Sequence, residues 1–333
     1  MTSPIRGYVT RSQTSAEHDP MTQDQSADKS DSPVWSGSDF PYVCLKDRGR
    51  TLELMAAVTD LVRPGDVVLD LGSGSGILSL AAARAGASEV IAVELDSLMA
   101  RTLRQTVSAN GYEDIITVVN TDARTLQDLE PDLVLAELID TGLMDEPLVP
   151  VMNHLTESGV VNEHTRLLFA GYTTTLTLVE ADHDYYGFKI LAPKHEWPYY
   201  ETDAAGSGWW KTAWRSSGEP VTAGTWSFGG EVIEPLVERR LDVPTGSVNS
   251  LLIEGSMHLG TGAELGSFNS LNAPKLLPID SALLESGQLL VSYVMGGGLQ
   301  SLAIRDARED AIIDLRRSPT TDAQSAIDEL HGA

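Results

Sequence analysis

The sequence has 333 residues, a formal net charge of −25 and 42% hydrophobic residues, which is typical of a soluble globular chain long enough for two domains. So acidic a chain is a poor binder of bare nucleic acid, whose phosphates require a basic face, and its negative field favours cationic partners. The single Cys44 excludes an internal disulfide, and no apolar run approaches the roughly 20 residues of a membrane helix. Residues 1–34 are rich in Ser, Thr, Gln and Asp and lack an apolar stretch, so we expect a disordered tail, no signal peptide and a cytoplasmic location.

Strands and helices alternate through the first ordered part of the chain. Helical apolar spacing predicts helices over residues 51–62, 76–86 and 97–110. Short runs rich in apolar residues predict buried strands over residues 66–71, 89–95, 116–122 and 131–138. This alternation predicts a doubly wound α/β domain with a parallel sheet, which we place at residues 35–158.

The pattern changes after about residue 160. Runs rich in Thr, Val, Leu and aromatic residues, separated by Gly, Pro and Asn, occur over 166–181, 248–260 and 287–298. Such runs predict a β-barrel-like domain, which we place at residues 159–306 and expect to be followed by a C-terminal tail, 307–333. The expected fold class is therefore α/β followed by β.

The stretch "LDLGSGSG", residues 69–76, places three glycines at a strand-to-helix turn. Glycine permits positive φ and lets a ligand approach the backbone, and the helix that follows offers free amides. Alone, the stretch is also compatible with a turn that binds nothing. Both NAD and S-adenosylmethionine fit such a loop. Its D-x-G-x-G-x-G spacing differs from the dinucleotide fingerprint and matches class I methyltransferases, so we predict S-adenosylmethionine.

Two carboxylates end the neighbouring predicted strands. Glu94 lies about 20 residues beyond the loop, where an acid can accept hydrogen bonds from both ribose hydroxyls of a nucleoside. Asp122 ends the third strand, where it could accept the adenine amino group. The predicted cofactor-binding residues in this region are Asp70, Gly72, Ser73, Gly74, Gly76, Glu94, Leu95, Asp122 and Ala123.

The stretch "ELIDTGLMDE" follows the fourth predicted strand and carries Glu137 and Glu146. Two carboxylates can hold a planar guanidinium through charge-assisted hydrogen bonds and can localise its charge on the nitrogens that do not react. The alternative is structural, with Glu137 capping a turn and Glu146 solvated. Asp140 and Asp145 are weaker candidates that would add negative potential.

The stretch "VVLDLGSGSGILSLAAARAGASEVIAVEL" resembles both protein arginine methyltransferases and ribosomal protein L11 methyltransferases. "LKDRGRT" is similar to the segment that precedes the fold in arginine methyltransferases, which implies that Arg50 holds the cofactor carboxylate. "ELxDTxLxxE" is closest to the monomethylating type III branch and implies catalytic roles for Glu137 and Glu146. The resemblance further implies a homodimer, in which an arm of the barrel domain within residues 185–214 clasps a second subunit. It implies a protein or peptide arginine, or a small guanidino compound, as substrate.

One family feature is absent. A Thr-His-Trp loop closes the substrate pocket in the family, and here Asn269, Ser270 and Leu271 occupy the corresponding places. His258 is a candidate replacement, or an ordinary structural histidine. The trio Trp209, Trp210 and Trp214 fits a partner surface or a barrel core. A methyltransferase for a small molecule or peptide natural product, and a non-catalytic cofactor-binding scaffold, are the alternative functions. No C-x-x-C or H-E-x-x-H pattern occurs, so we predict no metal site.

Overall fold

The computed structural model describes residues 40–195, 214–267 and 272–308, all within one compact unit, Ser36–Ala333. The predicted N-terminal tail, most of the C-terminal tail, Trp209, Trp210 and the segment Asn269 to Leu271 lie outside the described residues. No helix in the described ranges is long and apolar enough to cross a bilayer. The cytoplasmic location stays a prediction.

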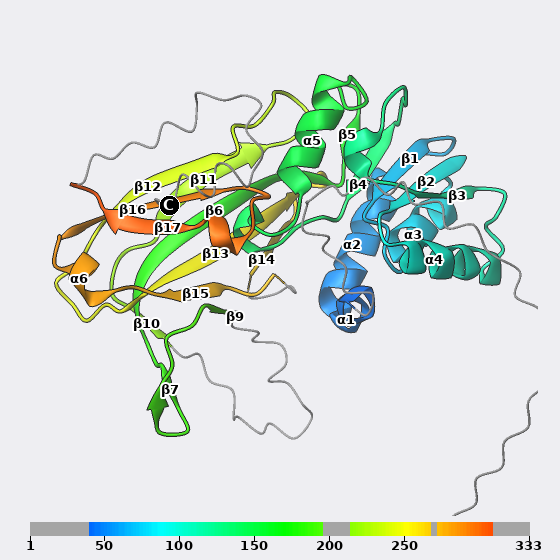
Figure 1. The fold of residues 1–333 in the computed structure, drawn as a ribbon. Helices are drawn as coiled ribbons and strands as arrows, with labels where there is room; N and C mark the ends of the chain where they lie inside the picture. The colour runs from blue at the N-terminus through cyan, green and yellow to red at the C-terminus, as the bar shows by residue number, and fades with distance from the viewer. Residues whose placement is uncertain (1–39, 196–213, 268–271, 309–333) are drawn as a thin grey trace, which may run out of the picture. The chain divides into compact units, whose positions relative to one another are not determined.

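The first half contains the parallel sheet and its helices (Figure 1). Its strands are β1 (Val67–Leu71), β2 (Glu89–Glu94), β3 (Ile116–Asn120), β4 (Leu133–Ala136) and β5 (Arg166–Leu167). Its helices are α1 (Phe40–Lys46), α2 (Arg48–Leu61), α3 (Ile77–Ala85), α4 (Ser97–Ala109) and α5 (Leu148–Glu157).

The strand order β3-β2-β1-β4-β5 is that of a doubly wound sheet, and its pairs are parallel. This order brings the ends of β1, β2 and β4 to one edge, where such sheets bind ligands. The predicted α/β domain is confirmed in its fold. Helix α5 was not predicted, and its Pro150 lies in the first turn, where a proline interrupts no intrahelical hydrogen bond.

In its described residues the second half consists of antiparallel strands with one short α-helix and the 3₁₀ helix η4 (Leu299–Ser301) (Figure 1). Its long strands are β6 (Phe169–Ala181), β11 (Val221–Ser227), β12 (Leu236–Asp242), β13 (Ser250–Leu259) and β16 (Gln288–Val294). Its shorter elements are β7 (Asp184–Tyr185), β8 (Phe188–Lys189), β9 (Lys194–His195), β10 (Trp214–Ser216), β14 (Glu264–Gly266), β15 (Lys275–Pro278), α6 (Ser281–Leu284) and β17 (Ala303–Asp306).

Strand β6 organises this half, because it pairs with β10, β11 and β13, while β15 and β9 extend the sheet beyond β13. A second sheet has the order β12-β16-β17. Strands β7 and β8 form a separate hairpin, in which Tyr186 and Gly187 both have positive φ angles, 55° and 85°, as a type I′ turn requires. The predicted β-rich second half is confirmed as antiparallel sheet. The domain boundaries stay predictions.

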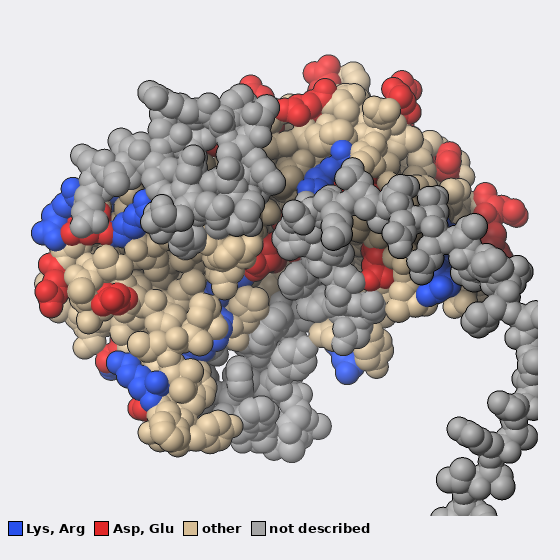
Figure 2. All heavy atoms as spheres, viewed as in Figure 1, with Lys and Arg blue, Asp and Glu red and all other residues tan. Residues whose placement is uncertain are grey.

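The main core is one apolar cluster that includes residues of both halves, among them Leu69 and Leu135 of the parallel sheet and Leu176 and Ile253 of the antiparallel one. Figure 2 shows Asp and Glu side chains in several separate places on the face in view, with Lys and Arg between them. The excess of negative charge is therefore not gathered into one patch on the part of this face that is described.

Candidate active site

The glycine loop joins β1 to α3 through left-handed backbone. Gly72, Gly74 and Gly76 have φ angles of 70°, 50° and 81°, a region that residues with a Cβ atom rarely adopt. Space is restricted as well, since a Cβ atom on Gly72 would lie 2.5 Å from Leu138 Cδ2 and one on Gly76 would lie 2.3 Å from Leu103 Cδ1. The loop therefore depends on these glycines, and it leads directly into the N-terminus of α3.

Two predicted residues hold this loop in place. The Ser73 hydroxyl donates to the carbonyl oxygens of Asp70, at 2.9 Å, and Val93, at 3.3 Å. Glu94 ends β2, and its two carboxylate oxygens accept the amides of Gly74 and Asp96, each at 2.9 Å. Because each carboxylate oxygen can accept a further hydrogen bond, Glu94 remains able to bind hydroxyl groups beside the loop.

The carboxylate that follows the third strand, Asp122, is already bound by a neighbouring residue. Asp122 follows β3 and caps the short helix η1 (Ala123–Thr125) by accepting the amide of Arg124 at 2.9 Å. Its carboxylate also forms an ion pair with the Arg124 guanidinium at 2.6 Å, and these hydrogen bonds lower the pKa of Asp122. An adenine amino group would share Asp122 with Arg124. Of the neighbouring predicted residues, Ala123 is buried and Leu95 is 47% exposed.

Arg50 lies in the first turn of α2, whose cap residue Asp47 accepts the Arg50 amide at 3.1 Å. The guanidinium is buried, and its Nη2 donates to Glu137 Oε1 in an ion pair. Burial lowers the pKa of Arg50, but the carboxylates near it, chiefly Glu137, outweigh that effect and raise the pKa. Its Nε is buried and has no hydrogen-bond partner among the described residues. This cation therefore has at least one buried donor that is unused.

Asp70 is buried at the end of β1, and its Oδ2 accepts the Ser79 hydroxyl of α3. Its Oδ1 is also buried and has no partner within the described part of the chain. Burial raises the pKa of Asp70 to about 7, against the opposing effect of the Ser79 hydrogen bond. Asp70 thus precedes the glycine loop in the chain and binds the helix that follows that loop.

Glu146 closes the loop that carries the two predicted catalytic carboxylates. Its amide donates to Asp140 Oδ1 at 3.1 Å, while its half-buried carboxylate makes no hydrogen bond or ion pair with any described residue. Burial, followed by the charges of Glu137 and Asp140, raises the pKa of Glu146 well above its ordinary value. Burial also raises the pKa of Glu137, and Arg50 opposes that rise. The structure therefore provides one carboxylate that is paired and one that is available.

Asp140 and Asp145 both bind the ammonium of Lys275 on β15, the Asp145 oxygen at 2.7 Å, so part of their charge is compensated. Asp140 still adds negative potential at Glu146, whose pKa it raises, as expected. Sequence reasoning missed Lys275, although a lone lysine within the apolar run "APKLLP" is a signal of a buried ion pair.

His195, and not the candidate His258, is the register partner of Lys275 in the β9–β15 pair. Burial, followed by the Lys275 charge, lowers the pKa of His195. His258 lies 3.1 Å from the Thr173 hydroxyl, between β13 and β6. His258 is thus engaged within the antiparallel sheet.

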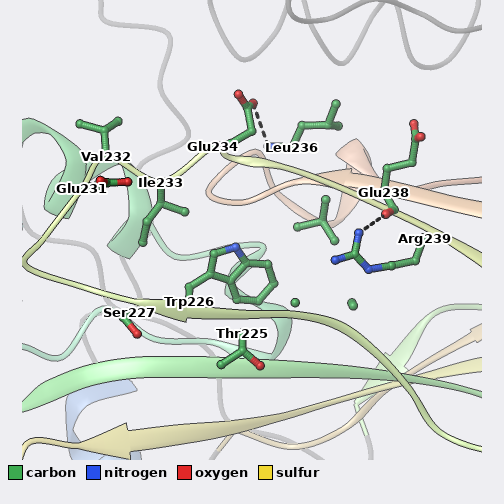
Figure 3. Close-up of a pocket in the computed structure, with 13 residues that line it drawn as sticks. Thr225, Trp226, Ser227, Glu231, Val232, Ile233, Glu234, Leu236, Glu238 and Arg239 are labelled. Carbon is green, nitrogen blue, oxygen red and sulfur yellow. Dashed lines mark hydrogen bonds between the residues drawn. The ribbon is translucent and has the colours of Figure 1, made fainter.

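A separate cavity of about 410 Å³ lies between β11 and β12 (Figure 3). Its lining includes Trp226, the carboxylate-bearing Glu231 and Glu234, and Arg239, whose Nη1 donates to the Glu238 carbonyl at 2.7 Å. It contains none of the predicted site residues. The candidate active site is therefore the glycine loop together with the loop of Glu137 and Glu146.

Known proteins match the chain in both sequence and fold. The family model "Ribosomal protein L11 methyltransferase (PrmA)" matches residues 50–197. The "Uncharacterized protein MJ1452" of Methanocaldococcus jannaschii is 31% identical over 270 residues, 79% of this chain and 95% of that protein. The "Arginine N(omega)-methyltransferase" of Streptomyces achromogenes subsp. streptozoticus is 38% identical over 121 residues, 35% of this chain and 34% of that protein. The solved Arabidopsis thaliana protein arginine methyltransferase 10 shares the fold, with a TM-score of 0.56, 17% identity and coverage of 75% of this chain and 86% of that one.

These matches identify an S-adenosylmethionine-dependent methyltransferase of the class I fold, with S-adenosylmethionine as its cofactor. The residues fit that molecule. The three glycines of the loop have no side chains to obstruct its approach, Glu94 has acceptor capacity for ribose hydroxyls, and Arg50 has an unused donor for a carboxylate.

Proposed function

We propose that this chain, which belongs to the family of the Methanocaldococcus jannaschii protein MJ1452, methylates a guanidino nitrogen. The observation that carries the proposal is the pair of carboxylates on the loop that follows β4. Glu137 is held by Arg50, and Glu146 is half-buried with no partner among the described residues. The similarity to an arginine methyltransferase over 121 residues supports the same acceptor chemistry.

Each residue then has a defined task. S-adenosylmethionine, when bound, supplies a methyl group on a sulfonium sulfur. Arg50 holds the carboxylate of the cofactor. The glycine loop lets the cofactor approach the protein backbone, and Glu94 accepts hydrogen bonds from the ribose hydroxyls. Glu137 and Glu146 hold the acceptor guanidinium and orient one nitrogen toward the methyl group.

The carboxylates also act on the electronic state of the acceptor. A guanidinium is protonated at neutral pH and is a poor nucleophile. Carboxylates that hydrogen-bond two of its nitrogens localise positive charge there and leave the third richer in electrons. The pKa of Glu146 is raised in the free protein by burial and by the neighbouring acids, and a bound cation opposes that rise, so acceptor binding favours the ionised carboxylate.

The motif "ELxDTxLxxE" supports transfer of a single methyl group, as in the branch that it resembles. The match to L11 methyltransferases favours a second candidate function, methylation of a protein at a nucleophile other than arginine, such as a lysine amine. A small-molecule or peptide natural product acceptor is compatible with the guanidino proposal. The nucleophile is a guanidino nitrogen in the first reaction and an amine in the second. The kind of acceptor that becomes methylated therefore distinguishes the two functions.

The test is methyl transfer from isotopically labelled S-adenosylmethionine to three acceptors in parallel: L-arginine, an arginine-containing peptide and a lysine-containing peptide. Mass spectrometry locates and counts the transferred methyl groups. We expect one methyl on a guanidino nitrogen, and we expect Glu146→Gln to abolish transfer. Methylation of lysine alone would replace the guanidino proposal with the amine one.

A further inference from the structure

We propose that Lys275 is a positioning residue for methyl transfer, because its buried ammonium fixes the shape of the loop that presents Glu146. The inference rests on the proposed function, which assigns Glu146 to the acceptor. Lys275 belongs to β15 of the antiparallel half, far along the chain from the loop that it binds.

The burial of Lys275 indicates how strongly it is held. The residue is 1% exposed, and its Nζ donates to Asp140 Oδ2 and, at 2.7 Å, to Asp145 Oδ2. A buried ammonium is stable only when it is paired and hydrogen-bonded. Both aspartates belong to the loop of Glu137 and Glu146, so the lysine links two separate positions of that loop.

The second carboxylate oxygen of each aspartate binds a backbone amide, so the contact with Lys275 also restrains the backbone. Asp140 Oδ1 accepts the amide of Glu146 at 3.1 Å, and Asp145 Oδ1 accepts the amide of Leu299 at 2.7 Å. Lys275 is therefore connected to the backbone of Glu146 through a single carboxylate. Displacement of Asp140 would displace the Glu146 backbone with it.

The loop has a shape that requires such support. Within its short helix η2 (Thr141–Leu143), Gly142 and Leu143 have φ angles of 83° and 57°, and left-handed backbone is unfavourable for leucine. The Tyr172 hydroxyl accepts the Gly142 amide at 3.2 Å and donates to the Asp140 carbonyl at 3.3 Å. A Cβ atom on Gly255 would lie 1.8 Å from that hydroxyl, so the strand β13 leaves room for it.

Charge gives Lys275 a second effect. The four carboxylates of the loop, Glu137, Asp140, Asp145 and Glu146, face two built-in cations, Arg50 and Lys275. Lys275 offsets one of the two aspartate charges and leaves the glutamates for the ligands. Its charge also lowers the pKa of Glu146 against the effects of burial and of the neighbouring acids. His195 faces the same ion pair from β9.

The experiment compares Lys275→Met, which removes the charge, with Lys275→Arg, which keeps it. Arg215→Met is the matched control, because it removes a cation of an exposed ion pair with Glu180 in the same sheet. The measurements are kcat and KM on the acceptor that the wild-type chain methylates, their pH profiles, and calorimetric affinity for S-adenosylhomocysteine. Binding of L-arginine to the S-adenosylhomocysteine complex gives a readout independent of turnover.

We expect Lys275→Met to lower kcat/KM by about 100-fold, the order of loss that follows misplacement of a reacting group. The acidic limb of its kcat/KM profile should move to higher pH, L-arginine binding should weaken, and affinity for S-adenosylhomocysteine should be retained. Lys275→Arg should recover part of the activity, and Arg215→Met should match the wild type.

Two outcomes overturn the inference. One is a Lys275→Met variant with wild-type kcat/KM and an unmoved acidic limb. The other is equal loss of cofactor affinity, L-arginine binding and thermal stability, which would make the lysine a general structural element. The proposed function fails separately, when the wild-type chain methylates only lysine. The same variants assayed on the lysine peptide then decide whether Lys275 positions the loop.

Discussion

The Arg50 guanidinium donates a hydrogen bond to the Glu137 carboxylate, so residues assigned to two different ligands form one buried ion pair. Arg50 was predicted to hold the cofactor and Glu137 the acceptor. Their contact means that a change at either residue reaches both binding sites. Glu146 makes no such contact with Arg50, although its charge lies near enough to raise the Arg50 pKa.

A double-mutant cycle tests this coupling. Arg50→Met should weaken S-adenosylmethionine binding by roughly 1.5 to 3 kcal/mol, the usual value of a hydrogen bond to a charged group. Combined with Glu137→Gln, the effects should deviate from additivity by about 0.5 to 3 kcal/mol. Combined with Glu146→Gln, they should deviate less. Calorimetric titration of each variant measures these values, and equal coupling in both cycles would contradict the separation of roles.

Glu146→Gln should stabilise the free protein at neutral pH while abolishing transfer. The pKa of Glu146 is raised in the folded state, so its contribution to stability is fully present below the unfolded value and is lost as pH rises through the folded value. Glutamine cannot ionise, and the variant avoids this loss. Thermal unfolding at pH 5 and pH 8 measures the effect. A variant less stable than wild type at pH 8 would show that the Glu146 charge is compensated in the free protein.

Asp70→Asn should flatten the dependence of stability on pH. The pKa of Asp70 rises from 3.8 to about 7 on folding, so stability is present at low pH and declines as pH rises through about 7. At roughly 1.4 kcal/mol per pKa unit, the decline attributable to this carboxylate is about 4 kcal/mol. Chemical denaturation from about pH 3.5, below the unfolded pKa, to about pH 8 should show it in wild type and not in the variant. A parallel decline in both proteins would assign the pH dependence to another group.

Glu94 and Asp122 should differ in their importance for the cofactor. Glu94→Ala removes the acceptor for the Gly74 amide and for the ribose hydroxyls together, so affinity for S-adenosylmethionine should fall by about 100-fold, the equivalent of roughly 3 kcal/mol. Asp122→Asn should have a smaller effect, since Arg124 already occupies that carboxylate. Calorimetry with each variant ranks them. A larger loss from Asp122→Asn would reverse this assignment.

The homodimer remains a prediction, and the β7–β8 hairpin is the segment that best supports it. Tyr186 is 100% exposed and Phe188 is 70% exposed, and apolar groups gathered in this way mark interaction surfaces. Light scattering at micromolar concentration should give a dimer for wild type and a monomer for Tyr186→Ser combined with Phe188→Ser. Val232→Ser, which alters an exposed apolar residue outside the hairpin, is the control. A monomeric wild-type chain would refute the prediction.

The sequence predicted the cofactor half well because its determinants are local. Apolar runs of fixed period set β1, α3, β2 and α4, and glycines at positive φ set the turn between β1 and α3. The carboxyl ends of parallel strands share one edge of the sheet, so the sequence alone places Glu94 and Glu137 near the glycine loop.

The loop of Glu137 and Glu146 belongs to the cofactor half in sequence, but its shape was decided by tertiary structure. Lys275, Tyr172 and the turn at Leu299 hold it from the antiparallel half. A buried charge must find its partner wherever the fold brings one, and no local period encodes a contact between residues 140 and 275. The sequence thus determined which carboxylates are present and at which strand end they lie. Only the fold decided that the aspartates pair with Lys275 and that one glutamate pairs with Arg50, because burial and long-range pairing determine which charges meet.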